Sequence, residues 1–332
     1  MKLKHLFLLL LTVTSSSVFS QSEDGFPTFR MNGTLKTKVE YASAIEQGRF
    51  SVRNSRLIFG GKVAPMVDYR GQLELSGLGR FQVLDLVGII KPIDNLALTF
   101  GQATIPLLDT YVHSPGQIMF ANRTFAVELA GTRDIGLMAA YSFNAGNIPI
   151  LAEAGIFNAN DINQAVWTDT LSYIGRLSFG SMDGWRLQGK VYNYPNAVTQ
   201  QHFVFYGMSA RYATQNWRIE AEALKRDDQN DRNLSVFSTY LQGAYVYPIQ
   251  SKLFKSIIPA FRWDTMDQNL SENAFDVNRF TWGLSFALTD RSNPSLIRID
   301  YEWYKVNNRI NSFFPTPDTD SNKITLELLL NF

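Results

Sequence analysis

Several segments of the sequence carry charged side chains at every second position. In VDYRGQLELS, residues 67–76, Asp68, Arg70 and Glu74 alternate with apolar residues such as Leu73 and Leu75. Because side chains of a β-strand point alternately to opposite faces, this segment has one ionic and one apolar face. Rings of Arg and Lys select anions in channels. Ionic faces gathered around a common lumen could therefore pass anions.

Cationic candidates for such a lining occur in most of the alternating segments. Those with the ionic parity are Arg70, Arg176, Arg186, Lys190, Arg211, Arg218, Arg262, Arg279 and Arg298. Acidic residues have the same parity at Asp68, Glu74, Glu220, Glu222, Asp264, Asp300, Glu302 and Glu327. Two interpretations therefore stay open. Either the arginines cluster at a constriction and select anions, or opposed charges set a transverse field in a general pore.

Residue types that carry catalysis or bind metals are scarce. The sequence has no Cys and three histidines, of which His5 lies in the N-terminal apolar segment. A nucleophilic site needs a base beside a Ser or a comparable group, and neither His113 nor His202 stands in a recognisable catalytic pattern. We expect His113 to hydrogen-bond or titrate in the pore. We predict no enzyme, no metal and no cofactor.

The elements that position these residues are short alternating segments, of which we count about sixteen. An even number is typical of bacterial single-chain barrels. The predicted strands cover residues 28–42, 50–63, 66–76, 81–91, 95–105, 133–143, 148–157, 170–180, 185–194, 202–212, 217–225, 235–247, 255–264, 277–288, 295–304 and 322–332.

The connections between these segments alternate between short and long. Tight links such as PIDN and SMDG are rich in turn residues, whereas RDDQNDRNL and KVNNRINSFFPTPDTDS are longer. Short turns at one end and long loops at the other are the anatomy of an outer-membrane barrel. A soluble β-sandwich also alternates apolar and polar residues. It would normally split a chain of this length into units, and no Pro/Gly/Ser-rich boundary is present.

The N-terminal residues have the pattern of a secretory signal peptide. Lys2 and Lys4 precede the apolar run LFLLLLTVT and the small polar stretch SSSVFSQ. We expect residues 1–20 to be cleaved, leaving residues 21–332 as the barrel domain. The whole sequence has 31 basic and 30 acidic residues, so removal of the two lysines keeps the balance near zero. No bulk basicity suggests nucleic acid as a partner.

The C-terminal segment KITLELLLNF ends on an apolar stripe. Phe332 is the last member of the stripe that begins at Ile324. In a closed barrel the last strand pairs with the first, and its lipid-facing side stays apolar to the end. A terminal strand ending in Phe also resembles the assembly signal of bacterial outer-membrane proteins. We therefore expect the barrel-assembly machinery to recognise Phe332.

The longest connection, residues 106–131, differs from the others because it is substantially apolar. Its sequence, PLLDTYVHSPGQIMFANRTFAVELAG, carries Arg123, His113 and Glu128. A sixteen-stranded barrel leaves an aqueous channel unless something fills it. An apolar loop folded against the inside of the wall would be buried there and would narrow the channel. We predict that this third long loop forms the constriction.

Four blocks of the sequence resemble the phosphate-selective porin O and P family: residues 49–77, 96–107, 131–137 and 257–264. The resemblance implies a sixteen-stranded trimeric porin whose third loop folds inward and which carries anions, phosphate in some members, past constriction arginines. The Arg-rich segment of the family matches Arg53 and Arg56, but Asn54 stands where a second arginine is often found. Arg53 shares the parity of Leu57, so it lines the pore only if a β-bulge or the rim intervenes.

Together these patterns predict an all-β protein, a transmembrane antiparallel β-barrel of about sixteen strands with an inward-folded third outer loop. We expect a passive porin in the outer membrane of a Gram-negative bacterium, in contact with lipid and assembled as a homotrimer. Small hydrophilic solutes would pass, with a preference for anions and possible selection of phosphate. A non-selective or oligosaccharide porin is the alternative. A barrel enzyme or a surface anchor has less support.

Overall fold

A computed structural model describes residues 25–77, 80–112, 115–131, 133–196, 199–231, 234–268, 275–309 and 321–332 of the chain. The expected signal peptide, residues 1–20, and His113 lie outside the described residues. Within the described part, no helix is long and apolar enough to cross a membrane. The same part holds no cluster of three or more His, Cys, Asp or Glu side chains placed to bind a metal ion.

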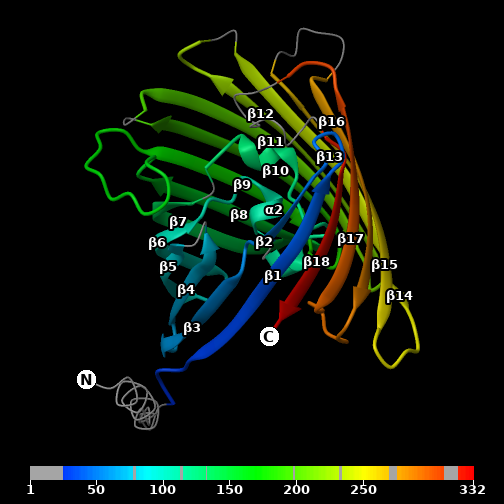
Figure 1. Cartoon of the computed structure of the whole chain (residues 1–332). Coiled ribbons are helices and arrows are strands. Elements are labelled where there is room, and N and C mark those ends of the chain that lie inside the picture. The colour runs from blue at the N-terminus through cyan, green and yellow to red at the C-terminus, as the bar shows by residue number, and fades with distance from the viewer. Residues whose placement is uncertain are drawn as a thin grey trace, which may run out of the picture.

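The described residues form one continuous antiparallel sheet (Figure 1). Its segments are β1 (Arg30–Ala42), β2 (Gln47–Val52), β3 (Arg56–Ala64), β4 (Val67–Gly77), β5 (Arg80–Ile93), β6 (Leu96–Thr104), β7 (Arg133–Ala145), β8 (Ile148–Phe157), β9 (Ser172–Gly180), β10 (Gly184–Asn196), β11 (Gln201–Ala213), β12 (Trp217–Asp228), β13 (Ser235–Tyr245), β14 (Tyr247–Pro248), β15 (Ser256–Asp267), β16 (Val277–Ala287), β17 (Leu296–Val306) and β18 (Lys323–Asn331).

These segments make sixteen barrel strands, because two of the strands are interrupted. β2 and β3 both pair with β1, and β13 and β14 both pair with β15. β18 pairs with β1 from Thr34 opposite Asn331 to Ala42 opposite Lys323, which closes the sheet on itself. The prediction of a closed antiparallel barrel of about sixteen strands is confirmed.

The two-residue alternation of the sequence separates the inside of the barrel from its outside. In β18, Ile324, Leu326 and Leu328 are exposed on the outer face, whereas Thr325 and Glu327 are fully buried on the inner face. The same pattern gives the other strands an apolar outer face that suits contact with lipid chains. The charged residues of the alternating segments therefore point into the barrel.

The ends of the described chain meet at the end of the barrel that carries the short turns, which we call the short-turn end. The backbone N–H of Gly33 donates to the carbonyl of Phe332 at 2.8 Å, and the reverse bond measures 3.0 Å. The aromatic ring of Phe332 lies over Gly33, where a Cβ atom would stand 2.5 Å from it. The last residue is thus part of the seam between β18 and β1.

The connection between β6 and β7, which we call the inner loop, lies inside the barrel (Figure 1). Its described part contains α2 (Asp109–Val112), η1 (Pro115–Gln117) and η2 (Phe125–Glu128). Leu107, Leu108, Phe125 and Leu129 are almost fully buried against inward side chains of β10 to β16. Each buried side chain of this size contributes about 1.5–3 kcal/mol. The apolar sequence of the loop therefore places it on the wall.

Candidate pore constriction and its charged lining

Cationic side chains of the wall hold the backbone of the inner loop. They donate to carbonyl oxygens of five loop residues between 117 and 123, and a hydrogen bond from a charged donor contributes about 1.5–3 kcal/mol. The contacts are Arg218 Nη1 to Gln117 O at 2.5 Å, Arg298 Nη2 to Ile118 O at 3.0 Å, Lys36 Nζ to Ala121 O at 3.3 Å, Arg262 Nη1 to Asn122 O at 2.9 Å and Arg279 Nη2 to Arg123 O at 2.6 Å.

Acidic side chains of the same wall accept hydrogen bonds from N–H groups of the loop. The bonds run from Ala121 N to Asp300 Oδ2 at 2.7 Å and from Phe125 N to Asp264 Oδ2 at 3.0 Å. Buried backbone groups need such partners, because an unpaired one costs about 1–3 kcal/mol. The mixed charges that we read from the sequence therefore serve first to fix the loop in one position.

Three of the predicted pore arginines are enclosed between wall and loop. Arg262, Arg279 and Arg298 are at most 4% exposed. The Phe120 ring covers the Arg262 guanidinium at 4.6 Å, and the Phe125 ring covers that of Arg279 at 4.4 Å. These three arginines point inward, as their parity predicted, but they do not line the open lumen. They are enclosed because the loop lies on them, and their parity alone did not indicate this.

A buried ion triad fixes the beginning of α2. The Lys190 ammonium lies 2.7 Å from Asp109 Oδ1 and 2.6 Å from Glu222 Oε1, and its side chain is fully buried. Burial opposes the charged form of Asp109, but Lys190 outweighs it and lowers the pKa of Asp109 to about 2. Asp109 therefore stays ionised at neutral pH. Lys190 also acts as an anchor of the loop and has no access to solute.

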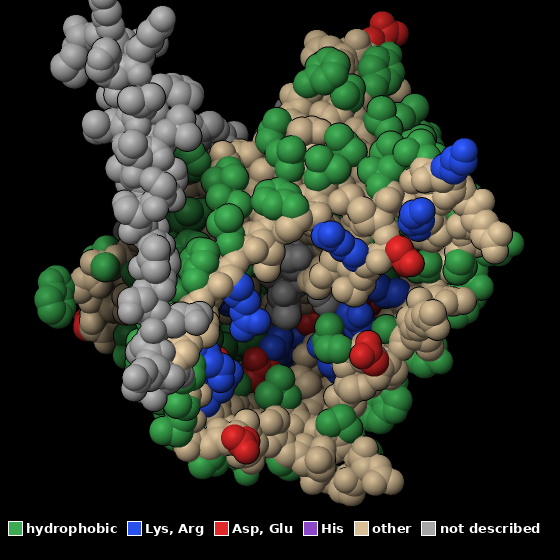
Figure 2. All heavy atoms as spheres, turned by 90° about the horizontal axis from the view of Figure 1, so that it is seen from below, with side chains coloured by type: hydrophobic (Ala, Val, Ile, Leu, Met, Phe, Trp, Pro, Cys, Tyr) green, Lys and Arg blue, Asp and Glu red, His purple; other side chains and the backbone are tan. Residues whose placement is uncertain are grey.

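Arg186, Arg211 and Arg218 lie below this triad, at the short-turn end of β10, β11 and β12. Arg211 Nη1 bonds to Glu220 Oε1 at 2.9 Å, and Arg218 Nε bonds to the same oxygen at 2.8 Å. Seen from the short-turn end, Lys and Arg side chains gather around a recess in the middle of the barrel (Figure 2). Arg176 of β9 pairs with Glu153 of β8 and stands opposite Lys190 in the strand register.

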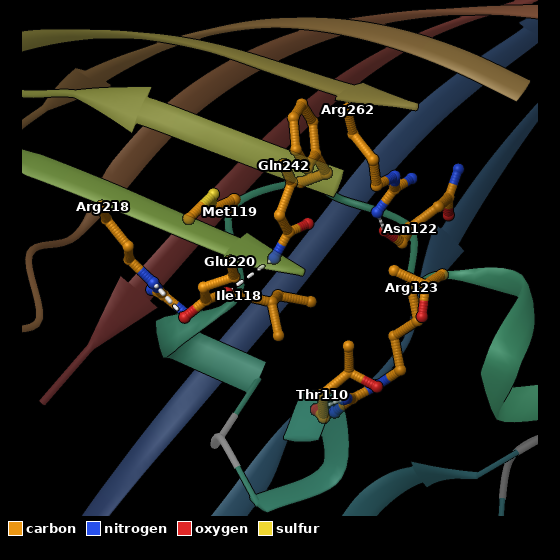
Figure 3. A pocket seen from close by; sticks show the side chains of 11 residues that line it. Thr110, Ile118, Met119, Asn122, Arg123, Arg218, Glu220, Gln242 and Arg262 are labelled. Carbon is orange, nitrogen blue, oxygen red and sulfur yellow. Dashed lines mark hydrogen bonds and ion pairs between the residues drawn. The ribbon is translucent and has the colours of Figure 1, made fainter. Parts of the chain in front are cut away.

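Arg123 does not project into the open lumen as a single charge. Its guanidinium donates to the carbonyl of Thr110 within the inner loop, and it points along the loop in Figure 3. The cavity in this view, between the loop and β12, β13 and β15, has a volume of about 10 Å³. A single water needs about that much space. The loop thus fits the wall closely on this side.

The open part of the lumen is lined by the opposite wall, where a β-bulge changes the parity of the chain. Val52 pairs with Thr37, but Arg56 pairs with Thr34, so the bulged strand has one extra residue between these pairs. Asn54 has a φ of 56° at this point. The backbone N–H of Arg53 donates to Lys36 O, and the side chain of Lys36 is inward. Arg53 and Arg56 are consequently both inward.

Five arginines from β2, β3, β4, β7 and the link between β2 and β3 form a group, which we call the arginine strip: Arg49, Arg53, Arg56, Arg70 and Arg133. Arg56 and Arg133 are buried within it. Asp85 joins two of its members, with 3.0 Å to Arg70 and 2.8 Å to Arg133. Arg56 pairs with Glu74 at 2.9 Å, and Arg49 pairs with Glu40 at 2.8 Å. The side chains of Arg49 and Arg70 are about half exposed, at 51% and 47%. Arg53 is exposed as well. The strip therefore has more positive than negative charges.

Sequence reasoning missed two members of the strip. Arg49 belongs to β2 but precedes the range predicted for that strand. Glu40 lies opposite it on β1, and its opposite charge could have indicated the pairing. Arg133 is the first residue of β7, where the parity of a strand is hardest to assign at the end of a long loop. Both residues could have been proposed only with the register known.

Glu128 faces the arginine strip from the inner loop. It is exposed at the end of η2, and Arg53 is its strongest charged neighbour. Partial removal from water raises the pKa of Glu128 above its usual value, against the attraction of Arg53 and Arg279. The open lumen therefore has arginines on one wall and a carboxyl group on the loop. This carboxyl group gains a proton more readily than an ordinary glutamate does.

The described histidine, His202, is placed near the long-loop end of β11. Its Nε2 atom lies 2.7 Å from Asn193 Oδ1. The prediction that the chain is not an enzyme stays a prediction.

Comparison with solved structures places the fold among the outer-membrane porins. The chain is similar to an anion-selective porin from Comamonas acidovorans, with a TM-score of 0.65, 11% identity, and coverage of 92% of this chain and 99% of that one. It is similar to OmpF of Salmonella typhi, with a TM-score of 0.62, 9% identity, and coverage of 92% and 97%. It is also similar to the trimer form of OmpT, an outer membrane protein of Vibrio cholerae, with a TM-score of 0.60, 12% identity, and coverage of 92% and 99%.

No protein-family model and no curated sequence matches the chain. The resemblance to the phosphate-selective porins therefore stays a prediction. At such low identity the likeness concerns the fold, which is that of the sixteen-stranded outer-membrane porins.

Proposed function

We propose that the chain is a passive outer-membrane porin that prefers anions, and that the arginine strip sets this preference. The observation that carries the proposal is the inward position of Arg53, which the β-bulge turns into the lumen opposite Glu128. Arg49 and Arg70 extend the exposed positive surface above and below it. Guanidinium groups at a narrow passage with low-dielectric walls raise the local concentration of anions.

The balance of charges supports anions over cations. The strip has five arginines, and the carboxylates paired with them are Glu40, Glu74 and Asp85. The basic residues on the opposite wall are engaged by the loop and by their own ion pairs. A general pore with a transverse field is the second candidate, because Glu128 faces the strip across the lumen. The excess of arginine favours the first candidate.

Phosphate is the finer part of the proposal. The Arg-rich segment of the resembled family matches Arg53 and Arg56, and arginines bind phosphate oxygens well through paired N–H groups. Asn54 departs from the family pattern. Its left-handed backbone, with a φ of 56°, is tolerated by Asn more readily than by Arg, so a second arginine at this position would be strained. The departure therefore follows from the bulge and leaves the two inward arginines in place.

The remaining parts of the proposal concern placement in the cell. We propose export through cleavage of residues 1–20, insertion in the outer membrane of a Gram-negative bacterium with the long loops outward, and recognition of Phe332 by the barrel-assembly machinery. The trimer form of the similar OmpT supports a homotrimer. Lipid surrounds the apolar outer face, small hydrophilic solutes diffuse through the lumen, and no cofactor takes part.

The test is the chloride current of the purified protein in a planar bilayer before and after addition of inorganic phosphate. We expect phosphate to reduce the current, and Arg53→Gln and Arg56→Gln to weaken that reduction. Lys252→Gln, in the exposed turn after β14, is the matched control and should behave as the unmodified protein. A current that phosphate leaves unchanged would contradict phosphate binding. The anion preference is tested separately by the reversal potential.

A further inference from the structure

A cavity of about 220 Å³ lies on the long-loop side of the inner loop. The end of the loop, residues 128–131, forms one side, and Asp161 of the connection between β8 and β9 forms another. Inward side chains of β10, β11 and β12 form the remainder. The cavity contains none of the arginines of the arginine strip, and it shares with the region facing the strip only Glu128.

The floor of the cavity is a square of four aromatic rings. Tyr192 pairs across the strands with Phe205, and Tyr194 pairs with Phe203. Neighbouring ring centroids are 5.6–6.3 Å apart, at 5.6 Å for Tyr192 and Tyr194, 5.7 Å for Tyr192 and Phe205, and 6.3 Å for Phe203 and Phe205. The inward positions lower on the same strands are polar, for example Lys190. Tyr192 and Phe205 are buried under the loop, whereas Tyr194 is half-buried beside the cavity.

The rim of the cavity carries polar groups with fixed directions. The Tyr194 hydroxyl donates to Asp161 Oδ1 at 3.1 Å, and Asn196 Nδ2 donates to the Tyr194 oxygen at 2.6 Å. Arg226 Nη1 donates to Leu129 O at 3.1 Å, and its guanidinium lies 4.5 Å from the centroid of Phe203. Such a floor of rings with a rim of amide, carboxyl and guanidinium groups is the usual design of a site for a small polar ligand with an apolar face.

The charges of the cavity indicate which ligands it does not suit. Arg226 contributes one positive charge, while Asp161 and Glu128 contribute two carboxyl groups. An anion would meet more negative than positive charge. An organic cation would seek the face of an aromatic ring, but Arg226 already takes that position over Phe203. A neutral ligand is therefore favoured.

We propose that this cavity binds one pyranose ring of a neutral oligosaccharide. The C–H face of a sugar ring is apolar and packs on an aromatic ring, here Tyr194, while its hydroxyl groups both donate and accept. Asp161 accepts from such hydroxyls, and Arg226 donates to them. The site would retain a sugar at the entrance of the pore. It does not depend on the anion preference of the arginine strip.

The test uses maltotriose as the probe in single-channel recordings, added on the long-loop side. We expect transient interruptions of the current. Tyr194→Ala, which removes the ring on which the sugar packs, should weaken binding. Asp161→Asn, which removes the charged acceptor, should weaken it about tenfold, the loss expected for one charged hydrogen bond. Asn tolerates the φ of 66° at position 161. Asp169→Asn, on the same connection but outside the cavity, is the matched control.

Tyr194→Phe keeps the ring and removes only the hydroxyl, so it remains informative if Tyr194→Ala does not fold. It should bind maltotriose more weakly than the unmodified protein and more strongly than Tyr194→Ala. Absence of interruptions, or interruptions that Asp161→Asn and both Tyr194 variants leave unchanged, would overturn the proposal. The reversal potential measured on the same channels reports on the anion preference, so failure of one proposal is distinguishable from failure of the other.

Discussion

Replacement of Lys190 by Met tests the idea that buried ion pairs hold the inner loop in place. The ammonium of Lys190 is fully buried between Asp109 and Glu222, at 2.7 and 2.6 Å. Met has nearly the same shape but no charge. Glu222 would keep the hydrogen bond from the backbone of Asp109, but two carboxylates would then face each other away from water. Release of α2 from the wall would relieve this repulsion.

The size of the effect follows from the loss of one member of a buried ion pair. Such a loss costs about 3–5 kcal/mol, which corresponds to a shift of about two to four powers of ten in the equilibrium between bound and released loop. The anchors at Arg218, Arg262 and Arg298 lie further along the loop and remain. We therefore expect local release of residues 105–112, with an intact barrel.

Single-channel recording is the assay, because a released loop segment changes the cross-section of the lumen. Lys190→Met should show a larger or fluctuating conductance, and Lys190→Met combined with Asp109→Asn should restore part of the steady level. Arg176→Met is the matched control, since it also breaks a buried ion pair, but one whose two members both belong to wall strands. A steady conductance of the original size in Lys190→Met would refute the role of the triad as an anchor.

Three further predictions concern the lining and the seam. Arg53→Gln should reduce the ratio of anion to cation permeability about threefold, since a unit charge about 7 Å from a permeating ion in water contributes about 0.6 kcal/mol. A permeability ratio equal to that of the control Lys252→Gln would contradict this prediction. The anion preference should rise as the pH falls through the raised pKa of Glu128, because protonation removes the negative charge that faces the strip. Glu128→Gln should show the high anion preference at every pH in that range. An equal pH response in the variant and the unmodified protein would refute the assignment. Gly33→Ala should lower the free energy of unfolding in urea by about 1 kcal/mol, because the new Cβ meets the aromatic ring of Phe332. Gly189→Ala places its Cβ in open space and should leave the free energy of unfolding almost unchanged. Equal free energies of unfolding for the two variants would contradict the packing of the seam.

The strands and the buried position of the inner loop could be predicted, because both depend on patterns in the local sequence. Alternation along residues 322–332 predicted both faces of β18, because one face meets lipid and the other meets the ionic interior. The apolar composition of residues 106–131 similarly indicated a buried loop. In both cases the partition between apolar and polar surroundings acts on the segment itself.

The roles of the individual arginines depend instead on what lies opposite each of them. Arg262 and Arg70 have the same parity and similar neighbours, but the loop covers Arg262 and leaves Arg70 about half exposed. Arg53 has the wrong parity in a regular strand and becomes inward through one extra residue at Asn54. Asn is compatible with a left-handed backbone, but it does not by itself reveal a bulge. Such roles require the three-dimensional register.

The reversal potential of the unmodified protein in a KCl gradient tests the central claim most directly. With a tenfold difference in KCl across a planar bilayer, the account predicts a potential with the sign of the chloride equilibrium potential. This result is expected because Arg49, Arg53 and Arg70 expose positive charge in the lumen. A potential near zero, or one with the sign of the potassium equilibrium potential, would contradict the assignment of the arginine strip as an anion selector.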